Sequence, residues 1–224
     1  MDIIAANDWE RPIYFAASAG SGDFLGLEKF MRLEGLAYRL VPYNTEHGET
    51  GEIGEVSSEI MYDNVMNKMS WGRMNEPDVS IEENNRRQFA IIDLRNTLSR
   101  LAFQLSEEGQ MNKAQEVMKK CLDLMPKDKF PYDYKMLTVI NALYASKMET
   151  TAEKVSMEMA DDFFATTSWL SSLASDGFNE DREYNLCMTI VGYLARIASE
   201  NGSDKTAEYI DKLYQQISGS SALD

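Results

Sequence analysis

Histidine and cysteine, which most often supply nucleophilic or metal chemistry, are scarce in this sequence. His47 is the only histidine in 224 residues, and it lies in an acidic, glycine-rich stretch. A Ser-His-Asp triad or a histidine-ligated zinc site would have to use it, so its setting argues against both. Cys121 and Cys187 lie far apart in helical patterns and without a CxxC spacing, and we interpret them as buried small apolar residues. We expect no catalytic residue, metal or cofactor in this chain.

Long apolar runs and an excess of basic residues are also missing. A membrane-spanning helix needs about 20 apolar residues, and the sequence shows neither such a run nor a secretory signal, so the chain is not expected to span a membrane itself. Lys and Arg number 22 against 37 Asp and Glu, which gives a formal net charge of -15. Because contacts to phosphates need clustered Lys and Arg, this balance argues against nucleic-acid partners.

The first 58 residues predict a small α/β module. The stretches IYFAAS (13–18) and LAYRLVPY (36–43) predict two strands. Between them, FLGLEKFMRLEG (24–35) has apolar residues at a helical period and ends in Gly35, a typical helix stop. Strand, helix and strand at this length predict a βαβ-like unit with two parallel strands and a right-handed crossover.

A glycine pair follows the first predicted strand, where many proteins bind a phosphate at a helix N-terminus. Gly20, Gly22 and Gly26 have one residue too many for the dinucleotide-binding fingerprint, and no further strand is found after residue 43. We therefore favour a structural turn. The alternative is an anion site formed by Gly20, Ser21 and Gly22, as part of a sugar-phosphate or nucleotide site within residues 11–46.

The next segment is an acidic loop and then a helix. The glutamates of residues 44–59 lack the tight Asp and Asn spacing of calcium loops, so a solvated loop is favoured over a cation site. A methionine-rich amphipathic helix is predicted over 59–71, followed by a linker. Ser80 and Glu83 form a capping box, and nearly everything after it is predicted to be helical.

Two stretches of the helical part match each other. In LAFQLSEEGQMNKA (101–114) and LARIASENGSDKTA (194–207), Leu-Ala, Ser-Glu, Gly and Ala recur at the same offsets. This pattern is typical of a tetratricopeptide helix pair. Small Ala102 and Ala114 let two helices cross closely, Gly109 forms the turn, and a proline at 126 ends the second helix.

A degraded third copy is predicted between these two, at residues 135–155. There Ala152 takes the place of Ala114, and Lys147 replaces the turn glycine. The surplus stretch 163–183 predicts an elongated or extra helix. Three imperfect pairs suffice for a short stacked array, because each pair covers the apolar face of its neighbour.

The predicted fold class is therefore mainly α, with tetratricopeptide-like helix pairs preceded by a small βαβ-like module. The predicted organisation is a module with an acidic loop at 1–58, a helix and linker at 59–85, the helical array at 86–218 and a disordered tail at 219–224.

The inner face of such an array is the usual peptide groove, lined by residues of the first helix in each pair. An aromatic ring, an amide and a cation at one register position could hold an extended segment; these are Phe103, Asn141 and Arg196. Packing of Phe103 against the rest of the protein is the alternative. The full set predicted to line the groove is Asn96, Ser99, Phe103, Tyr134, Asn141, Tyr144, Thr189 and Arg196.

Two strings near the N-terminus are unusual in composition: NDWERPIYFA (7–16) and LEKFMRLEGLAYRLVP (27–42). Together with a helical-repeat tail, they resemble the C-terminal soluble region of a bacterial family of polytopic membrane proteins. That family is the protein O-mannosyltransferase-like class, which carries a domain of unknown function. The resemblance covers the first 43 residues; the remainder is similar only in its helical character.

This resemblance implies a parent protein that is a lipid-sugar-dependent glycosyltransferase, with its catalytic acids in membrane helices outside this chain. The chain itself is then an excised, soluble, non-enzymatic tail on the extracytoplasmic (periplasmic) side of the inner membrane. It is expected to bind an acceptor polypeptide or a protein partner. A scaffold or dimerisation domain is the alternative.

Overall fold

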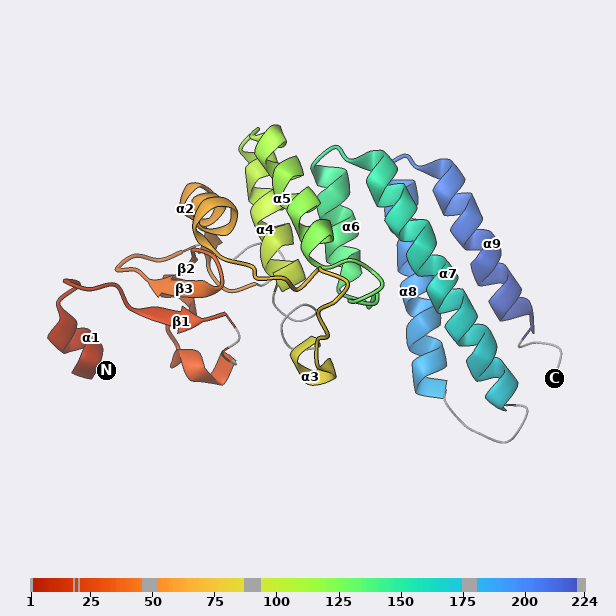
Figure 1. Ribbon diagram of the computed structural model, residues 1–224, viewed down its shortest axis with the longest axis horizontal. Coiled ribbons are helices and arrows are strands. Elements are labelled where there is room, and N and C mark those ends of the chain that lie inside the picture. The colour runs from red at the N-terminus through yellow and green to blue at the C-terminus, as the bar shows by residue number, and fades with distance from the viewer. Residues whose placement is uncertain are drawn as a thin grey trace. The chain divides into compact units, whose positions relative to one another are not determined.

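The computed structural model describes residues 2–17, 19, 21–45, 52–86, 94–174 and 181–220. The protein is mainly helical, and a small four-stranded sheet near the N-terminus precedes the longer helices (Figure 1). This confirms the predicted mainly α class. The chain divides into two compact units, Met1–Phe130 and Pro131–Asp224, so the boundary follows the first predicted helix pair.

The sheet of the first unit follows a short helix, α1 (Asp2–Asn7). Its strands lie in the order β1-β3-β2-β4, and their bounds are Tyr14–Ala16 for β1, Met31–Leu33 for β2, Ala37–Leu40 for β3 and Glu55–Val56 for β4. Strand β3 is antiparallel to both β1 and β2, whereas β2 and β4 are parallel. The two predicted strands are thus confirmed in place, and β4 was missed after residue 43.

The predicted crossover helix over 24–35 is wrong. Two short 3-10 helices, η1 (Ser21–Phe24) and η2 (Glu28–Phe30), occupy its first part, and β2 occupies the rest. Gly35, with φ of +136°, forms a tight turn in which the Glu34 N–H donates to the Ala37 carbonyl at 3.1 Å. This turn is too short for a crossover, so β2 and β3 form an antiparallel hairpin and the βαβ-like parallel pairing is also wrong.

Burial along the hairpin has a period of two, as expected for a sheet with one covered face. Met31 and Leu33 of β2 and Tyr38 and Leu40 of β3 are buried on that face. Phe24 packs edge-on against Tyr38, with ring centroids 5.8 Å apart. The core of the module is therefore formed by the hairpin together with Phe24 from the 3-10 segment, and not by a crossover helix.

Helical structure follows β4. Helix α2 (Ser58–Asp63) continues into a π-helical turn, η3 (Asn64–Lys68), and this confirms the helix predicted over 59–71. The segment before helix α3 (Glu83–Arg86) is held by Lys129, whose ammonium donates to the Val79 carbonyl at 2.9 Å.

The first helix pair is α4 (Arg95–Glu107) and α5 (Met111–Leu124). Ala102 and Ala114 are fully buried, in agreement with the predicted close crossing of the two helices. Helix α2 packs against α4, and its Ser58 hydroxyl donates to Glu108 at 2.7 Å.

The second unit contains four helices among its described residues: α6 (Met136–Ala145), α7 (Glu149–Ala174), α8 (Asp181–Glu200) and α9 (Asp204–Ser220). Helices α7, α8 and α9 pack against one another, and α6 packs against α7 and α8. The surplus stretch predicted as an elongated or extra helix begins in α7, whose 26 residues extend well past the length of α5. Helix α9 continues to Ser220, into the range expected as a tail.

The turns that join α4 to α5, α6 to α7 and α8 to α9 have the same backbone geometry. Each contains one left-handed residue, at Gly109, Lys147 and Gly202. The N–H of the next residue donates to a carbonyl five residues earlier, in the pairs Gln110 to Leu105, Met148 to Leu143 and Ser203 to Ala198 at 2.8–2.9 Å. These are Schellman motifs, which satisfy the last carbonyls of a helix. The predicted turns are therefore confirmed; that the pairs belong to the tetratricopeptide class stays a prediction.

Candidate functional site

The predicted groove residues of α4 do not form an open surface. Ser99 is fully buried, Asn96 and Phe103 are half-buried, and Ser99 is therefore a correction to the predicted set. The physical reason is that α4 packs on two sides, against α5 and against α2 and β4. A helix covered on both sides does not present Ser99 to a ligand.

In the second unit the predicted residues differ in exposure. Tyr134 is exposed, Asn141 is half-buried, and Tyr144 is 3% exposed, so Tyr144 is a second correction. Burial also raises the pKa of the Tyr144 hydroxyl. Helix α6 contacts both α7 and α8, and this leaves Tyr144 inside.

Thr189 and Arg196 lie on an exposed face of α8. We call this face the α8 stripe; its residues are Arg182, Leu186, Thr189, Tyr193 and Arg196, all exposed. Their spacing of four and three residues places them along one side of the helix. Leu186 is 50% exposed and Tyr193 is 42% exposed, which are high values for apolar side chains. The Arg196 guanidinium stacks over the Tyr193 ring at 4.8 Å from its centroid.

The glycine pair does not lead into a helix that could bind an anion. Ser21 and Gly22 lie in the four-residue η1, and Gly20 is outside the described residues. Because the anion site was motivated by a helix N-terminus, the structure removes its main physical argument. The structural turn remains the favoured interpretation.

Both cysteines are free and buried, which confirms the sequence interpretation. Burial raises the pKa of the Cys121 thiol to about 12, so it stays protonated at neutral pH. In the part of the chain that the structure describes, no group of His, Cys, Asp and Glu side chains is placed to hold a metal ion. His47 lies outside that part.

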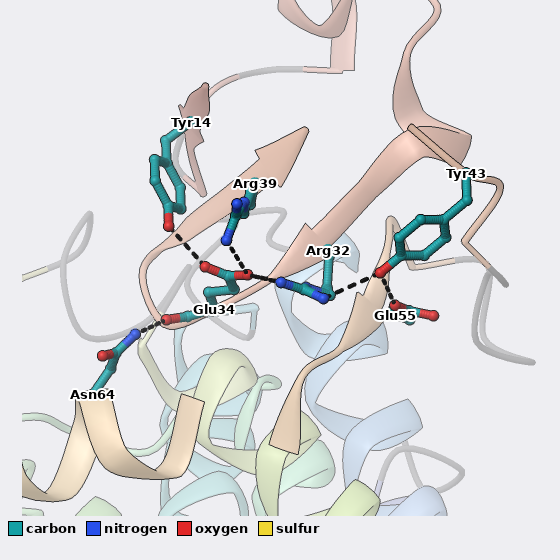
Figure 2. Close-up of polar contacts among 7 residues, drawn as sticks. All are labelled: Tyr14, Arg32, Glu34, Arg39, Tyr43, Glu55 and Asn64. Carbon is teal, nitrogen blue, oxygen red and sulfur yellow. Dashed lines mark hydrogen bonds and ion pairs between the residues drawn. The ribbon is translucent and has the colours of Figure 1, made fainter. Parts of the chain in front are cut away.

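A second polar site lies on the outer face of the N-terminal sheet (Figure 2). We call it the sheet-face cluster, and its residues are Tyr14, Arg32, Glu34, Arg39, Tyr43 and Glu55. The strand register places Tyr14 opposite Arg39, Arg39 opposite Arg32, and Arg32 opposite Glu55. Four side chains therefore form a row across the four strands.

Glu34 is the centre of this cluster and is only 5% exposed. Its carboxylate accepts hydrogen bonds from the Tyr14 hydroxyl at 2.8 Å and from Arg32 Nε at 3.0 Å. A second Arg32 nitrogen, Nη2, also donates to it. The Glu34 main-chain carbonyl accepts from the Asn64 amide at 2.7 Å, so the turn is fixed from both sides.

The two arginines face each other across strands, an arrangement that is unfavourable for like charges. The buried Glu34 carboxylate offsets this repulsion, because Arg39 approaches it at 3.8 Å while Arg32 is hydrogen-bonded to it. Partial burial is the largest single influence on the Arg32 pKa and lowers it, but the hydrogen bond to Glu34, the charge of Glu34 and the contact with Tyr43 together outweigh it and raise the Arg32 pKa. Partial burial and the same carboxylate raise the pKa of Tyr14.

The far end of the row is negative. Arg32 Nη1 donates to the Tyr43 hydroxyl at 3.1 Å, and that hydroxyl donates to Glu55 at 3.2 Å. Sequence reasoning missed the cluster, because the register that aligns its residues follows only from the antiparallel hairpin. A signal was present: Tyr14, Glu34 and Arg39 all lie in the two strings that carry the family resemblance.

The sheet is joined to α4 by a buried arginine. Arg100 donates to the Gly54 carbonyl at 2.6 Å and to the Tyr38 hydroxyl at 3.2 Å, and its Nε lies 2.8 Å from the Glu52 carboxylate. These contacts connect the helix to both the sheet and the loop before β4. Arg100 therefore has a structural role within the first unit.

The fold and its sites define a mainly helical protein with a small N-terminal sheet, a surface cluster on that sheet and an exposed stripe on α8. None of the helices in the described ranges is long and apolar enough to cross a membrane. A protein-family model, TMEM260-associated domain 2, matches residues 1–60 and relates this part of the chain to a membrane protein family. No curated protein and no solved structure matches the chain.

Proposed function

We propose that this chain is a non-catalytic accessory domain of a larger membrane protein of the glycosyltransferase-like class, and that it binds an acceptor polypeptide or a protein partner. The observation that carries the binding proposal is the α8 stripe, which exposes Leu186 and Tyr193 on an ordered helix. The match to a TMEM260-associated domain supports the link to a membrane protein, as do the strings at 7–16 and 27–42.

The α8 stripe has the chemistry of a binding surface. Tyr and Arg are enriched where binding energy is concentrated, and stacking of Arg196 on Tyr193 holds both side chains in place. From Arg182 to Arg196 the stripe extends about 21 Å along the helix axis, at 1.5 Å per residue. That length suits several residues of an extended segment or about four turns of a helix.

The proposed location follows from the family resemblance. We propose the extracytoplasmic, periplasmic side of the inner membrane, where a tail of such a transferase would meet secreted acceptors. The complete reading frame tests whether this chain is part of a larger membrane protein. Membrane-spanning helices with transferase motifs upstream of the chain would support the proposal, and a soluble enzyme domain in their place would contradict it.

Binding is tested by selecting peptides from a displayed random library against the full chain and measuring each peptide by fluorescence anisotropy. A variant with both Leu186→Ser and Tyr193→Ser should weaken binding by at least about tenfold, because these side chains supply the apolar contact. Leu25→Ser is the matched control, since Leu25 is 68% exposed but lies in the first unit. If the double variant and the unsubstituted chain bound the peptide with equal affinity, a role of the α8 stripe in binding would be refuted.

Dimerisation through the same stripe is the second candidate. The alternation of four and three residues between exposed positions is the spacing with which two helices pack along a seam. Light scattering at low micromolar concentration distinguishes the two functions. If the unsubstituted chain is a dimer and the Leu186→Ser, Tyr193→Ser variant is a monomer, the result favours a dimerisation domain. If the unsubstituted chain is a monomer, the result argues against this function.

A further inference from the structure

We propose that the sheet-face cluster binds a carboxylate group of an acidic polypeptide segment, with Arg39, which lies between Tyr14 and Arg32 in the row, as its anchor. This site lies on the N-terminal sheet and is independent of the α8 stripe. The proposal rests on the strand register, on the unequal use of the two arginines and on the charge distribution along the row.

The two arginines of the cluster differ in how their donors are used. Arg32 places Nε and Nη2 on Glu34 and Nη1 on Tyr43, so its guanidinium is engaged on both sides. Arg39 lies 3.8 Å from the Glu34 carboxylate, beyond hydrogen-bonding distance, and its side chain is 39% exposed. Within the described part of the chain, Arg39 is therefore the member with donors left for a ligand.

The charge along the row is uneven. The guanidinium groups of Arg39 on β3 and Arg32 on β2 both face the single carboxylate of Glu34, which is hydrogen-bonded to Arg32 and only 3.8 Å from Arg39. The compensating carboxylate, Glu55, lies at the opposite end, on β4, where it accepts from Tyr43. The four charged side chains of the cluster sum to zero, and Arg39, two strands away from Glu55, is the positive end of the row. It favours one carboxylate and disfavours a polyanion, which needs many cations.

The cluster is already ordered without a ligand. Glu34 holds Tyr14 and Arg32, and Tyr43 is held between Arg32 and Glu55 (Figure 2). Side chains that are fixed before binding lose little conformational entropy on binding. Tyr14 is 48% exposed and Tyr43 is 45% exposed, so both rings are accessible to a peptide. The guanidinium fork matches the planar geometry of a carboxylate.

The test is a nuclear magnetic resonance titration of the full chain, observing the arginine Nε–H groups. The probe is the blocked peptide Ac-Gly-Glu-Gly-NH2, and Ac-Gly-Gln-Gly-NH2 is the matched neutral peptide, both at constant ionic strength. We expect the Arg39 signal to shift saturably with the glutamate peptide, at a Kd of roughly 10 mM for a single charged contact. The Arg32 signal should move less, because its donors are engaged.

Variants separate binding from folding. Arg39→Gln should abolish the saturable shift of neighbouring signals while the rest of the backbone spectrum is retained, and Arg196→Gln should leave the shift unchanged. Three results would each overturn the proposal: equal shifts with the glutamine peptide, a shift that persists in Arg39→Gln, or stronger binding of inorganic phosphate than of the glutamate peptide.

Discussion

Glu34 is buried on a face where its neighbours are partly exposed, and this makes it the most constrained residue of the sheet. Its carboxylate is the only acceptor shared by Tyr14 and Arg32 among the contacts described, and it also lies near Arg39. Because Arg32 and Arg39 are directly opposite each other, removal of this negative charge exposes their repulsion. The stability of the hairpin therefore depends on the negative charge of this one side chain.

Glu34→Gln should lower the free energy of unfolding by roughly 2 kcal/mol, because hydrogen bonds to a charged group are replaced by weaker ones. Urea denaturation, followed by fluorescence, measures this loss. Arg39→Gln is the matched control and should cost less than about 0.5 kcal/mol, since its ion pair is long and partly exposed. Equal effects of the two substitutions would show that Glu34 does not have the central role assigned here.

At the scale of elements, the three Schellman turns share one backbone geometry, but the left-handed residue is a glycine in two of them and a lysine in the third. Gly109 and Gly202 have no heavy atom within 4 Å of an added Cβ, so a substitution there tests backbone strain alone. Lys147 adopts the same conformation, at φ of +57°, although side chains disfavour it. The α6–α7 turn thus carries strain that the other two turns avoid.

Lys147→Gly should raise the free energy of unfolding by about 0.5–1 kcal/mol, whereas Gly109→Ala and Gly202→Ala should each lower it by about 1 kcal/mol. Lys147→Ala separates strain from loss of the lysine side chain and should have little effect. Thermal unfolding by circular dichroism gives all four values. If Lys147→Gly were neutral or destabilising, strain in this turn would be excluded.

These turns also show what could be predicted from the sequence. Gly109 and Gly202, with Ala114 and Ala207 five residues later, are local signals, and local signals predicted the helix pairs correctly. Residues 24–35 were mispredicted because short apolar runs fit both a helix and a hairpin, and only pairing with β1 and β4 decides between them. The same pairing assembles the sheet-face cluster, so the cluster could not be inferred without the register.

At the scale of the whole molecule, the chain divides into two compact units, and this raises the question whether the second unit is stable without the first. In an array, each pair depends on its neighbour for stability, so a fragment without the first pair should lose stability. In the structure, Pro131–Asp224 is a compact unit, and α7, α8 and α9 pack against one another within it. A unit with its own core can fold alone.

We therefore expect the fragment 131–224 to fold by itself. Its far-ultraviolet circular dichroism should be helical, and its thermal transition should be cooperative and within a few degrees of one transition of the full chain. The control is the same fragment with Leu194 replaced by Ala. Because Leu194 is fully buried in the core, this substitution should reduce the free energy of unfolding by about 2–5 kcal/mol and lower the temperature of the transition. A fragment that is helical but melts without cooperativity would instead favour a continuous array, in which α6 needs the preceding pair to complete its packing.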